Sequence, residues 1–412
     1  MIALATVLWL SLAVGTGAPV WPVAAAAARP AEPRPVAALG VAGALVYAAP
    51  SRDTPVGLAR SHAVLPVLEA RTASDCPSDW LRVGEAAWIC APTAERREDA
   101  RRAERWPPTP RPGSTLPFLY VHPRGRGHQS YPTVAAALER RDGTAFPSGH
   151  WESVDASFWR RGVELYRTVS GRFLRADDVR WAEASPLAGL PLDPHDAPWP
   201  WGFAIASPTW VYDEPPVARW MTPPPRAPKL PRHAPVRVEE LAERWVRIGP
   251  ERYLRRSEVR VFRPRARPDG VGAAERWLDV DLAEQLLAAY EGDLPRFVTP
   301  VSTGRGGLTR EGAFRVYRAA GTQTMRGLPT GDGGRTYTVR DIPWVLFFDE
   351  DRALHAAFWH SEFGVARSHG CINLPPTAAA WVFDFAGPKV PDGWQWIEPP
   401  DRTVGTLVHI HR

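Results

Sequence analysis

Proline clusters constrain this 412-residue sequence more than any other feature. The chain contains 45 prolines, and many of them gather within residues 29–57, 105–114 and 221–235. Proline fixes φ and has no backbone N–H, so such runs favour extended spacers over the interior of a sheet. A chain of this length also exceeds one ordinary hydrophobic core. We therefore expect several small domains separated by proline-rich connections.

Composition is that of a folded globular protein, with 44% hydrophobic and 23% charged residues. The net charge is +5, and because Lys229 and Lys389 are the only lysines, the other 48 basic residues are arginines. The arginines are scattered among 45 acidic residues without a long basic stripe. A codon bias that favours arginine over lysine explains this composition. We therefore expect no nucleic-acid partner.

The N-terminus is typical of an export signal. Residues 2–14 form an apolar run that is too short for a transmembrane helix, and small residues with an Ala-x-Ala pattern follow between Ala24 and Ala28. No Lys or Arg precedes the run. We expect residues 1–28 to be a cleaved signal, or alternatively an uncleaved anchor that gives the only membrane contact. The protein is then exported to the periplasm or cell envelope, and residues 29–57 form an Ala/Pro-rich linker.

Export changes the interpretation of the three cysteines. In an oxidising compartment, Cys76 and Cys90 can pair within one small β module at residues 58–104. We predict this disulfide, which leaves Cys371 as an unpaired thiol that needs an explanation.

A hairpin pattern recurs between the proline clusters. In residues 80–90, 166–175 and 245–254, an aromatic residue opens a short strand, a glycine turn follows, and a second aromatic residue opens the next strand. The pattern resembles the end of bacterial SH3-like barrels, although unrelated hairpins in one β-rich region remain an alternative. We expect an SH3-like module at 115–220 with a helix near 131–141, a linker at 221–235 and an SH3-like hairpin region at 236–265.

The last third of the chain is predicted to be mostly β with minor α structure. Alternating or continuous apolar runs predict strands at 276–281, 298–301, 313–316, 337–339, 344–348 and 406–410. Helix-forming residues predict helices at 282–290 and 375–385.

Cys371 lies in the stretch SHGCINL. A cysteine nucleophile needs a lowered pKa, a nearby base and donors for an oxyanion. Gly370 frees the backbone for close approach, the following helix would favour a thiolate, and His355 and His360 lie upstream. Two alternatives stay open at this point: His355, His360, His369 and Cys371 could form a zinc site, or Cys371 could be a buried structural residue.

The stretch HAAFWHSEFGVARSHGCINL, residues 355–374, resembles the catalytic motif of the L,D-transpeptidase family. His355 stands sixteen positions before Cys371, a spacing that the family uses, and Trp359-His360 and Phe363-Gly364 match one of its branches. Further similarity lies at 277–292, 302–304, 309–314 and 341–344, so the resemblance covers 274–411. It departs at Ala356, where the family usually has glycine. The resemblance implies a β-sandwich or barrel with one or two helices, and it places 282–290 across a turn between strands.

The resemblance also implies a function. Cys371 would attack a peptidoglycan tetrapeptide stem, release the terminal D-Ala and form a thioester, and an amine acceptor would then give a 3→3 cross-link or an attachment. His355 would be the acid and base, His369 would orient the site and support the oxyanion, and neither a metal nor an organic cofactor would be needed. The remaining expected substrate and oxyanion residues are Ser368, Gly370, Asn373, His360, Trp359 and Gly364.

Two rival functions differ in chemistry. With water as the acceptor, the protein would be an L,D-carboxypeptidase or a hydrolase of cross-links. With a vestigial catalytic domain, it would be a wall-binding scaffold that uses its aromatic hairpins. In each case the expected partner is peptidoglycan, and we expect a monomer.

Overall fold

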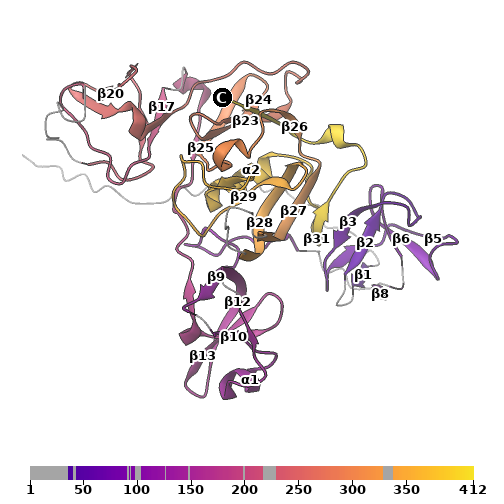
Figure 1. Cartoon of the computed structure of the whole chain (residues 1–412). Coiled ribbons are helices and arrows are strands. Elements are labelled where there is room, and N and C mark those ends of the chain that lie inside the picture. Colours follow the sequence, from indigo (N-terminus) through magenta and orange to yellow (C-terminus); the bar gives the residue numbers. More distant parts are fainter. Residues whose placement is uncertain are drawn as a thin grey trace, which may run out of the picture.

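The computed structural model describes residues 36–39, 43–90, 92, 94–97, 104–125, 127–146, 149–197, 200–216, 229–327 and 337–412 (Figure 1). These residues form a mostly β structure, as predicted, with two α-helices in the described ranges, α1 (Val134–Glu139) and α2 (Pro376–Phe385). No helix of these ranges is long and apolar enough to cross a membrane. The expected export signal at 1–28 lies outside the described residues.

A two-layer sandwich forms the C-terminal region. One layer is a six-stranded sheet in the order β16 (Leu190–Pro191), β25 (Leu294–Pro300), β24 (Leu286–Glu291), β23 (Arg276–Asp281), β32 (Leu407–His411) and β26 (Gly312–Arg315). The other layer contains β27 (Arg318–Gly327), β28 (Tyr337–Asp349), β29 (Arg352–Ala356), β30 (Ile372–Leu374) and β31 (Trp394–Ile397). One buried cluster joins the layers and α2, and it includes Leu278, Leu287, Val345, Ile372 and Val382.

The predicted helix at 282–290 is wrong, because the segment is a turn followed by β24. The Asp281 carboxylate accepts the N–H groups of Ala283 and Glu284 and so fixes the turn. Leu287 and Ala289 enter the sandwich core, whereas Leu286, Ala288 and Tyr290 belong to a second core on the opposite face. Burial of both faces removes the polar–apolar alternation of a strand, and this tertiary packing overrides helix propensity.

The other helix and strand predictions of this region are confirmed to within a few residues. The predicted helix at 375–385 is α2, and the strands at 276–281 and 406–410 are β23 and β32. The two segments predicted at 337–339 and 344–348 belong to one long strand, β28. Helix α2 begins with Pro376, and a proline at the first helical position costs no helical hydrogen bond.

The N-terminal module begins earlier than expected. Its strands are β1 (Val36–Leu39), β2 (Ala44–Tyr47), β3 (Pro55–Ala59), β4 (Val64–Pro66), β5 (Glu69–Thr72), β6 (Asp79–Gly84), β7 (Ala87–Cys90) and β8 (Ala94–Arg97). The predicted linker at 29–57 is therefore wrong in its described part. The apolar side chains of Val46 and Val56 lie in this module's own core, so strands form despite the alanine and proline content.

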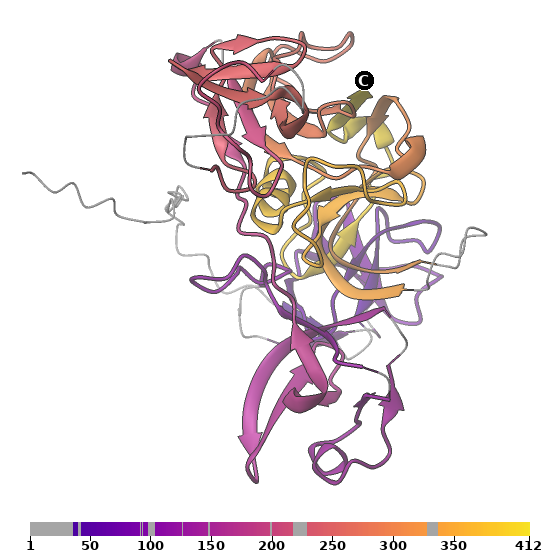
Figure 2. The same ribbon diagram turned by 60° about the vertical axis from the view of Figure 1, so that its left-hand side comes forward.

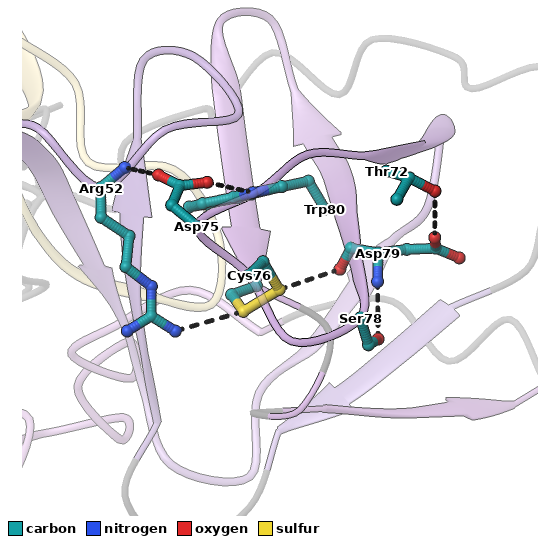
Figure 3. The surroundings of a disulfide bond; sticks show 8 residues. Arg52, Thr72, Asp75, Cys76, Ser78, Asp79 and Trp80 are labelled. Carbon is teal, nitrogen blue, oxygen red and sulfur yellow. Dashed lines mark hydrogen bonds between the residues drawn. A yellow bond between two sulfur atoms is a disulfide. The ribbon is translucent and has the colours of Figure 1, made fainter.

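A disulfide joins Cys76 and Cys90 in this module (Figure 3). Both cysteines are buried in a small cluster with Trp80 and Trp88. The indole N–H of Trp80 donates to Asp75 at 3.1 Å. The cross-link therefore ties a loop to the hairpin formed by β6 and β7.

Two further modules lie between this one and the sandwich. The first contains α1 and the strands β9 (Leu119–Pro123), β10 (Gln129–Ser130), β11 (Thr144–Ala145), β12 (His150–Arg160), β13 (Val163–Thr168), β14 (Phe173–Arg175) and β15 (Val179–Trp181). The second contains β17 (Trp201–Ala204), β18 (Pro235–Arg237), β19 (Glu240–Leu241), β20 (Trp245–Gly249), β21 (Arg252–Arg255) and β22 (Val259–Val261). Short 3-10 helices lie at Ala176–Asp178, Pro194–Asp196, Arg256–Glu258, Arg305–Gly307 and Arg402–Val404.

The expected division between modules at residues 221–235 is wrong. Strand β17 pairs with both β18 and β22, so residues on the two sides of the expected linker share one sheet. The predicted hairpins are present as β6–β7, β13–β14 and β20–β21. An SH3-like identity of these modules remains a prediction.

Backbone pairing joins two of the modules to the sandwich. Strand β3 pairs with β31, and β12 pairs in parallel with β28. Figure 1 shows the N-terminal module (indigo) beside β31, and both views show the module of β12 and β13 (magenta) projecting from the sandwich (Figure 2). The catalytic candidate Cys371 therefore lies in a domain that other modules extend by direct hydrogen bonding.

Candidate active site

The loop that carries Cys371 is held by the segment that follows β25. The backbone N–H groups of Arg367 and Ser368 donate to the carbonyl of Thr303 at 2.9 and 3.0 Å. The N–H of Arg305 donates back to the carbonyl of Ser368 at 3.1 Å. These paired contacts fix the loop against the segment that follows β25.

Three buried polar side chains support this loop. The amide of Gln285 donates to Thr303 Oγ1 at 2.6 Å and accepts the Thr303 N–H at 2.9 Å. Thr309 Oγ1 accepts the N–H of Gly304 and donates to the carbonyl of Gly370, both at 2.8 Å. In the sequence, Gln285, Thr303 and Thr309 belong only to the stretches that resemble the family. Gln285 is marked in the sequence only as a polar residue beside the apolar run at 286–290, and nothing in the local sequence marks Thr303 or Thr309.

Ser368 and Gly370 shape the backbone next to the sulfur. The Ser368 hydroxyl accepts the N–H of Gly370 at 3.1 Å and donates to the carbonyl of Cys371. Gly370 has a φ of 131°, and a Cβ there would lie 3.0 Å from Arg352 Nε and 3.2 Å from the carbonyl oxygen of Leu308. Only glycine fits this turn without strain.

Cys371 is half-buried immediately before β30. Its Sγ lies 3.9 Å from the carbonyl oxygen of Asp351. Burial raises the pKa of the Cys371 thiol, and the N–H of Ala353 and the charge of Arg352 oppose that rise. The residue types around Cys371 favour a lowered pKa, whereas burial acts in the opposite direction on the resting thiol.

His355 is buried on β29, which pairs in parallel with β30 and brings His355 opposite Asn373. Since alternate positions of a strand share a face, Cys371 approaches the side of the sheet that carries these two residues. His355 Nδ1 lies 3.0 Å from the carbonyl oxygen of Ala356, which favours a proton on Nδ1 and leaves Nε2 to accept one. Burial lowers the pKa of His355 to about 4, so its imidazole is neutral at pH 7.

His369 has a different environment. Its side chain is exposed and stacks on Tyr337, with ring centroids 6.0 Å apart. Burial raises the pKa of the Tyr337 hydroxyl, and the nearby Cys371 raises it further. Within the described residues, neither His355 nor His369 is hydrogen-bonded to the sulfur, so their separate catalytic roles remain predictions. Tyr337 is a neighbour of the site that sequence reasoning missed, since nothing in its local pattern distinguishes it from other strand tyrosines.

Trp359 and His360 follow β29 and connect the site to its surroundings. The Trp359 ring lies 5.9 Å from that of His355, and His360 Nε2 lies 3.2 Å from Asn373 Nδ2. Burial, together with the charge of Arg367, lowers the pKa of His360 to about 4. Gly364, with a φ of 90°, packs against Ile205, which a Cβ would approach to 2.5 Å. The structure thus brings most of the predicted residues to one region.

The zinc alternative does not find a ligand set in the described part of the chain. The one group of potential metal ligands there is Asp279, His409 and His411, which excludes all four residues considered for zinc. The Asp279 carboxylate lies 3.0 Å from His409 Nδ1 and 3.1 Å from His411 Nε2. Arg265 lies 2.8 Å from His411 Nδ1 and donates to it, so Nε2 carries the proton and faces Asp279. This tautomer suits a hydrogen-bonded network rather than a metal site.

Two cavities meet at Trp359, His360 and Ser361. One of about 810 Å³ opens toward the module of β17, and one of about 770 Å³ opens toward β9 and β15. Both are lined jointly by the sandwich and by residues that precede it. The surroundings of the candidate site therefore include parts of the chain that lie outside the motif-bearing domain.

Comparison with solved structures finds L,D-transpeptidases. A cysteine-to-serine mutant of the Enterococcus faecium L,D-transpeptidase is 22% identical, with 33% of this chain and 50% of that chain covered and a TM-score of 0.26. The catalytic domain of the E. faecium enzyme is 24% identical, with 34% and 98% covered and a TM-score of 0.26. L,D-transpeptidase 3 from Mycobacterium tuberculosis, in complex with a faropenem-derived adduct, is 16% identical, with 41% and 67% covered and a TM-score of 0.27.

The chain spans about half the length of the first two structures that it matches. No match was found among the curated proteins. The family comparison identifies the part of the chain that contains Cys371, His355 and the loop that supports them. Residues 275–410 match the family model of the L,D-transpeptidase catalytic domain, YkuD.

Proposed function

We propose that the whole chain is an exported L,D-transpeptidase that acts on peptidoglycan stem peptides in the cell envelope. The observation that carries the proposal is Cys371 at the end of a hydrogen-bonded Ser-His-Gly-Cys loop, inside the domain that matches the family. A glycine-based turn, a half-buried thiol and a neutral buried histidine are the parts that cysteine acyl transfer needs.

The first half-reaction is acylation. The Cys371 thiol attacks the carbonyl carbon of the residue before the terminal D-Ala, and its proton passes to the neutral imidazole of His355. A pKa of about 4 keeps His355 unprotonated at pH 7, so it is ready to accept that proton. The C–N bond then breaks, the imidazolium returns the proton to the leaving amine, and D-Ala departs while a thioester remains on Cys371.

Oxyanion stabilisation would come from the backbone. The N–H of Gly370 already donates to the Ser368 hydroxyl, so the N–H groups of His369 and Cys371 are the better donors. Such donors are worth most when they are fixed before the reaction begins. The contacts of Ser368 and Thr309 with this turn supply that rigidity.

The second half-reaction is transfer. The amine of an acceptor attacks the thioester, gives up a proton to His355 and forms a new amide as the thiol is regenerated. With a neighbouring stem as the acceptor, the product is a 3→3 cross-link. With water as the acceptor, the same intermediate gives a shortened tripeptide stem.

Incubation of the full chain with purified tetrapeptide muropeptides, followed by mass spectrometry, tests this proposal. Free D-Ala with dimers supports transpeptidation, whereas free D-Ala with tripeptide alone indicates a carboxypeptidase. Intact substrate after long incubation, with the thiol still reactive, contradicts both and leaves the wall-binding scaffold. Cys371→Ala is the matched control, since it removes the nucleophile and retains the small side-chain volume.

A further inference from the structure

One cavity joins the sandwich to the module of β9, β12 and β15. It has a volume of about 770 Å³, and residues 358–361 of the sandwich close one side of it. The module supplies the other side through His122, Arg124, Trp151, Arg180, Trp181 and Glu183. None of these six residues lies in the segment that matches the catalytic-domain family.

The wall of this cavity is a chain of aromatic rings held by one another. His122 lies against Trp151 with centroids 4.5 Å apart, and Trp151 meets Phe358 edge-on at 5.6 Å. Phe358 in turn contacts Trp359 edge-on at 5.0 Å. Because each ring is fixed by its neighbour, the wall is formed before any ligand arrives.

Trp181 extends this wall toward solvent. Its ring packs on Tyr166 at 4.6 Å, yet 42% of the residue remains exposed. A large indole that is held on one side and open on the other presents a flat apolar surface to a ligand. Such a surface suits a ring with one apolar face and polar edges, as a pyranose has.

The charged groups of the cavity favour a ligand that offers oxygen acceptors. Arg124 and Arg180 are exposed, and within the described residues neither makes an ion pair. Arg124 uses its Nε to donate to the carbonyl of Val179 at 2.7 Å, which positions its terminal nitrogens. Arg180 lies opposite His122 on the paired strands, and Glu183 supplies one opposing carboxylate. The two guanidinium groups can donate to carboxylate and amide oxygens.

A short series of contacts connects the cavity to the reacting sulfur. Trp359 and His360 line the cavity, and they contact His355 and Asn373 respectively. Asn373 stands two residues after Cys371, a separation of about 7 Å between Cα atoms in extended chain. A ligand in the cavity would therefore lie within one stem-peptide length of the nucleophile.

We propose that this cavity is a saccharide subsite that binds the N-acetylated glycan from which the substrate stem extends. The inference rests on the proposed function and names a further part of its substrate. The indole of Trp181 stacks on a sugar face, and Arg124 and Arg180 donate to the acetamido oxygen of the sugar and to carbonyl or carboxylate oxygens of the attached stem. The module before the catalytic domain thus recognises the sugar, whereas the domain itself recognises the peptide.

The test compares two substrates, a free tetrapeptide and the same tetrapeptide on its disaccharide. We expect the unmodified protein to show a higher kcat/KM for the disaccharide form. Arg180→Ala/Trp181→Ala should reduce the ratio of the two kcat/KM values by about tenfold, mainly through KM. The matched control is Trp159→Ala/Arg160→Ala, a second exposed Trp–Arg pair on the same module that lines neither cavity described above. This control should leave the ratio unchanged.

Binding measured without turnover separates this proposal from the catalytic one. Titration of Cys371→Ala with the peptide-free disaccharide should change tryptophan fluorescence, and adding Arg180→Ala/Trp181→Ala should abolish the change. Disaccharide binding to Cys371→Ala, together with no D-Ala release by the unmodified protein, would sustain the subsite and refute the proposed function. Equal losses for both substrates, no disaccharide binding, or the same loss in the control would overturn the subsite. Unchanged thermal unfolding would show that each variant is folded.

Discussion

Lowering the pH from 7 to 5 tests how the buried His355 works. Burial lowers its pKa to about 4, so about nine-tenths of the imidazole stays neutral at pH 5. An exposed histidine with a pKa of about 6.5 would be only about 3% neutral at that pH. The Cys371 thiol has a raised pKa and stays protonated at both pH values. If a neutral thiol reacts with a neutral base, acylation should therefore slow by no more than about twofold.

The assay follows acylation alone, because protonation of an amine acceptor would complicate the full reaction. The rate of D-Ala release is measured under single-turnover conditions, with protein in excess over substrate, at pH 5, 6 and 7 and constant ionic strength. Protein held at pH 5 and returned to pH 7 must recover its full rate, which excludes unfolding. A fall of tenfold or more between pH 7 and pH 5 would refute the assignment of a buried neutral base.

Replacement of the histidines identifies the group responsible. His355→Ala should slow acylation by about 10²–10⁴-fold, the usual contribution of a general base. His369→Ala is the matched comparison and should cost less, because its exposed ring stacks on Tyr337. Alkylation of Cys371, followed over a pH range that extends above the ordinary thiol pKa, should show a larger rise of the thiol pKa in His355→Ala than in His369→Ala. The reverse order would exchange the two roles.

The remaining predictions concern the nucleophile and the stability of the fold. Cys371→Ala should lose all D-Ala release yet retain the native circular dichroism spectrum, and a carbapenem should add its mass to the unmodified protein at Cys371 alone; residual turnover or an adduct elsewhere would contradict the nucleophile. Loss of the Cys76–Cys90 disulfide, which spans 14 positions, should lower the free energy of unfolding of its module by about 3 kcal/mol, as urea titration can measure, and no change would count against it. Tyr120→Phe removes a hydrogen bond of 2.6 Å to the carbonyl of Asp341 and should cost about 1 kcal/mol in the same assay, whereas a stabilised variant would refute the reasoning.

The sequence predicted those parts of the site that depend on residues close together in the chain. These are the Ser-His-Gly-Cys stretch, its spacing from His355 and the helix α2 that follows it. The supporting contacts of Gln285 and Thr309 were not predicted, since they come from turns far from Cys371 in sequence. Their contribution depends on sheet register, which a single sequence does not reveal.

The pKa of Cys371 and the extent of the modules were harder to predict for a physical reason. The thiol pKa depends on burial, and burial is a property of the assembled fold. Strand β24 likewise contains strong helix formers that are strand only because both of its faces are covered. The segment at 43–57 contains prolines and alanines, which disfavour strands. Its last strand, β3, nevertheless forms because it hydrogen-bonds to β31, more than 300 residues later in the chain.

The pairing of β3 with β31 and of β12 with β28 has a consequence for any shortened form of the protein. A fragment confined to the family-matched residues would lack β3 and β12. Strands β31 and β28 would then each lose one hydrogen-bonded partner. Unpaired strand edges offer N–H and C=O groups to any other chain and are a common cause of aggregation. We therefore expect the isolated domain to self-associate through these two edges, even though the same region is the best-defined catalytic part of the chain. The preceding modules cover these two strand edges. Because the modules are covalently attached, they prevent the sheet from pairing with a second copy of the chain.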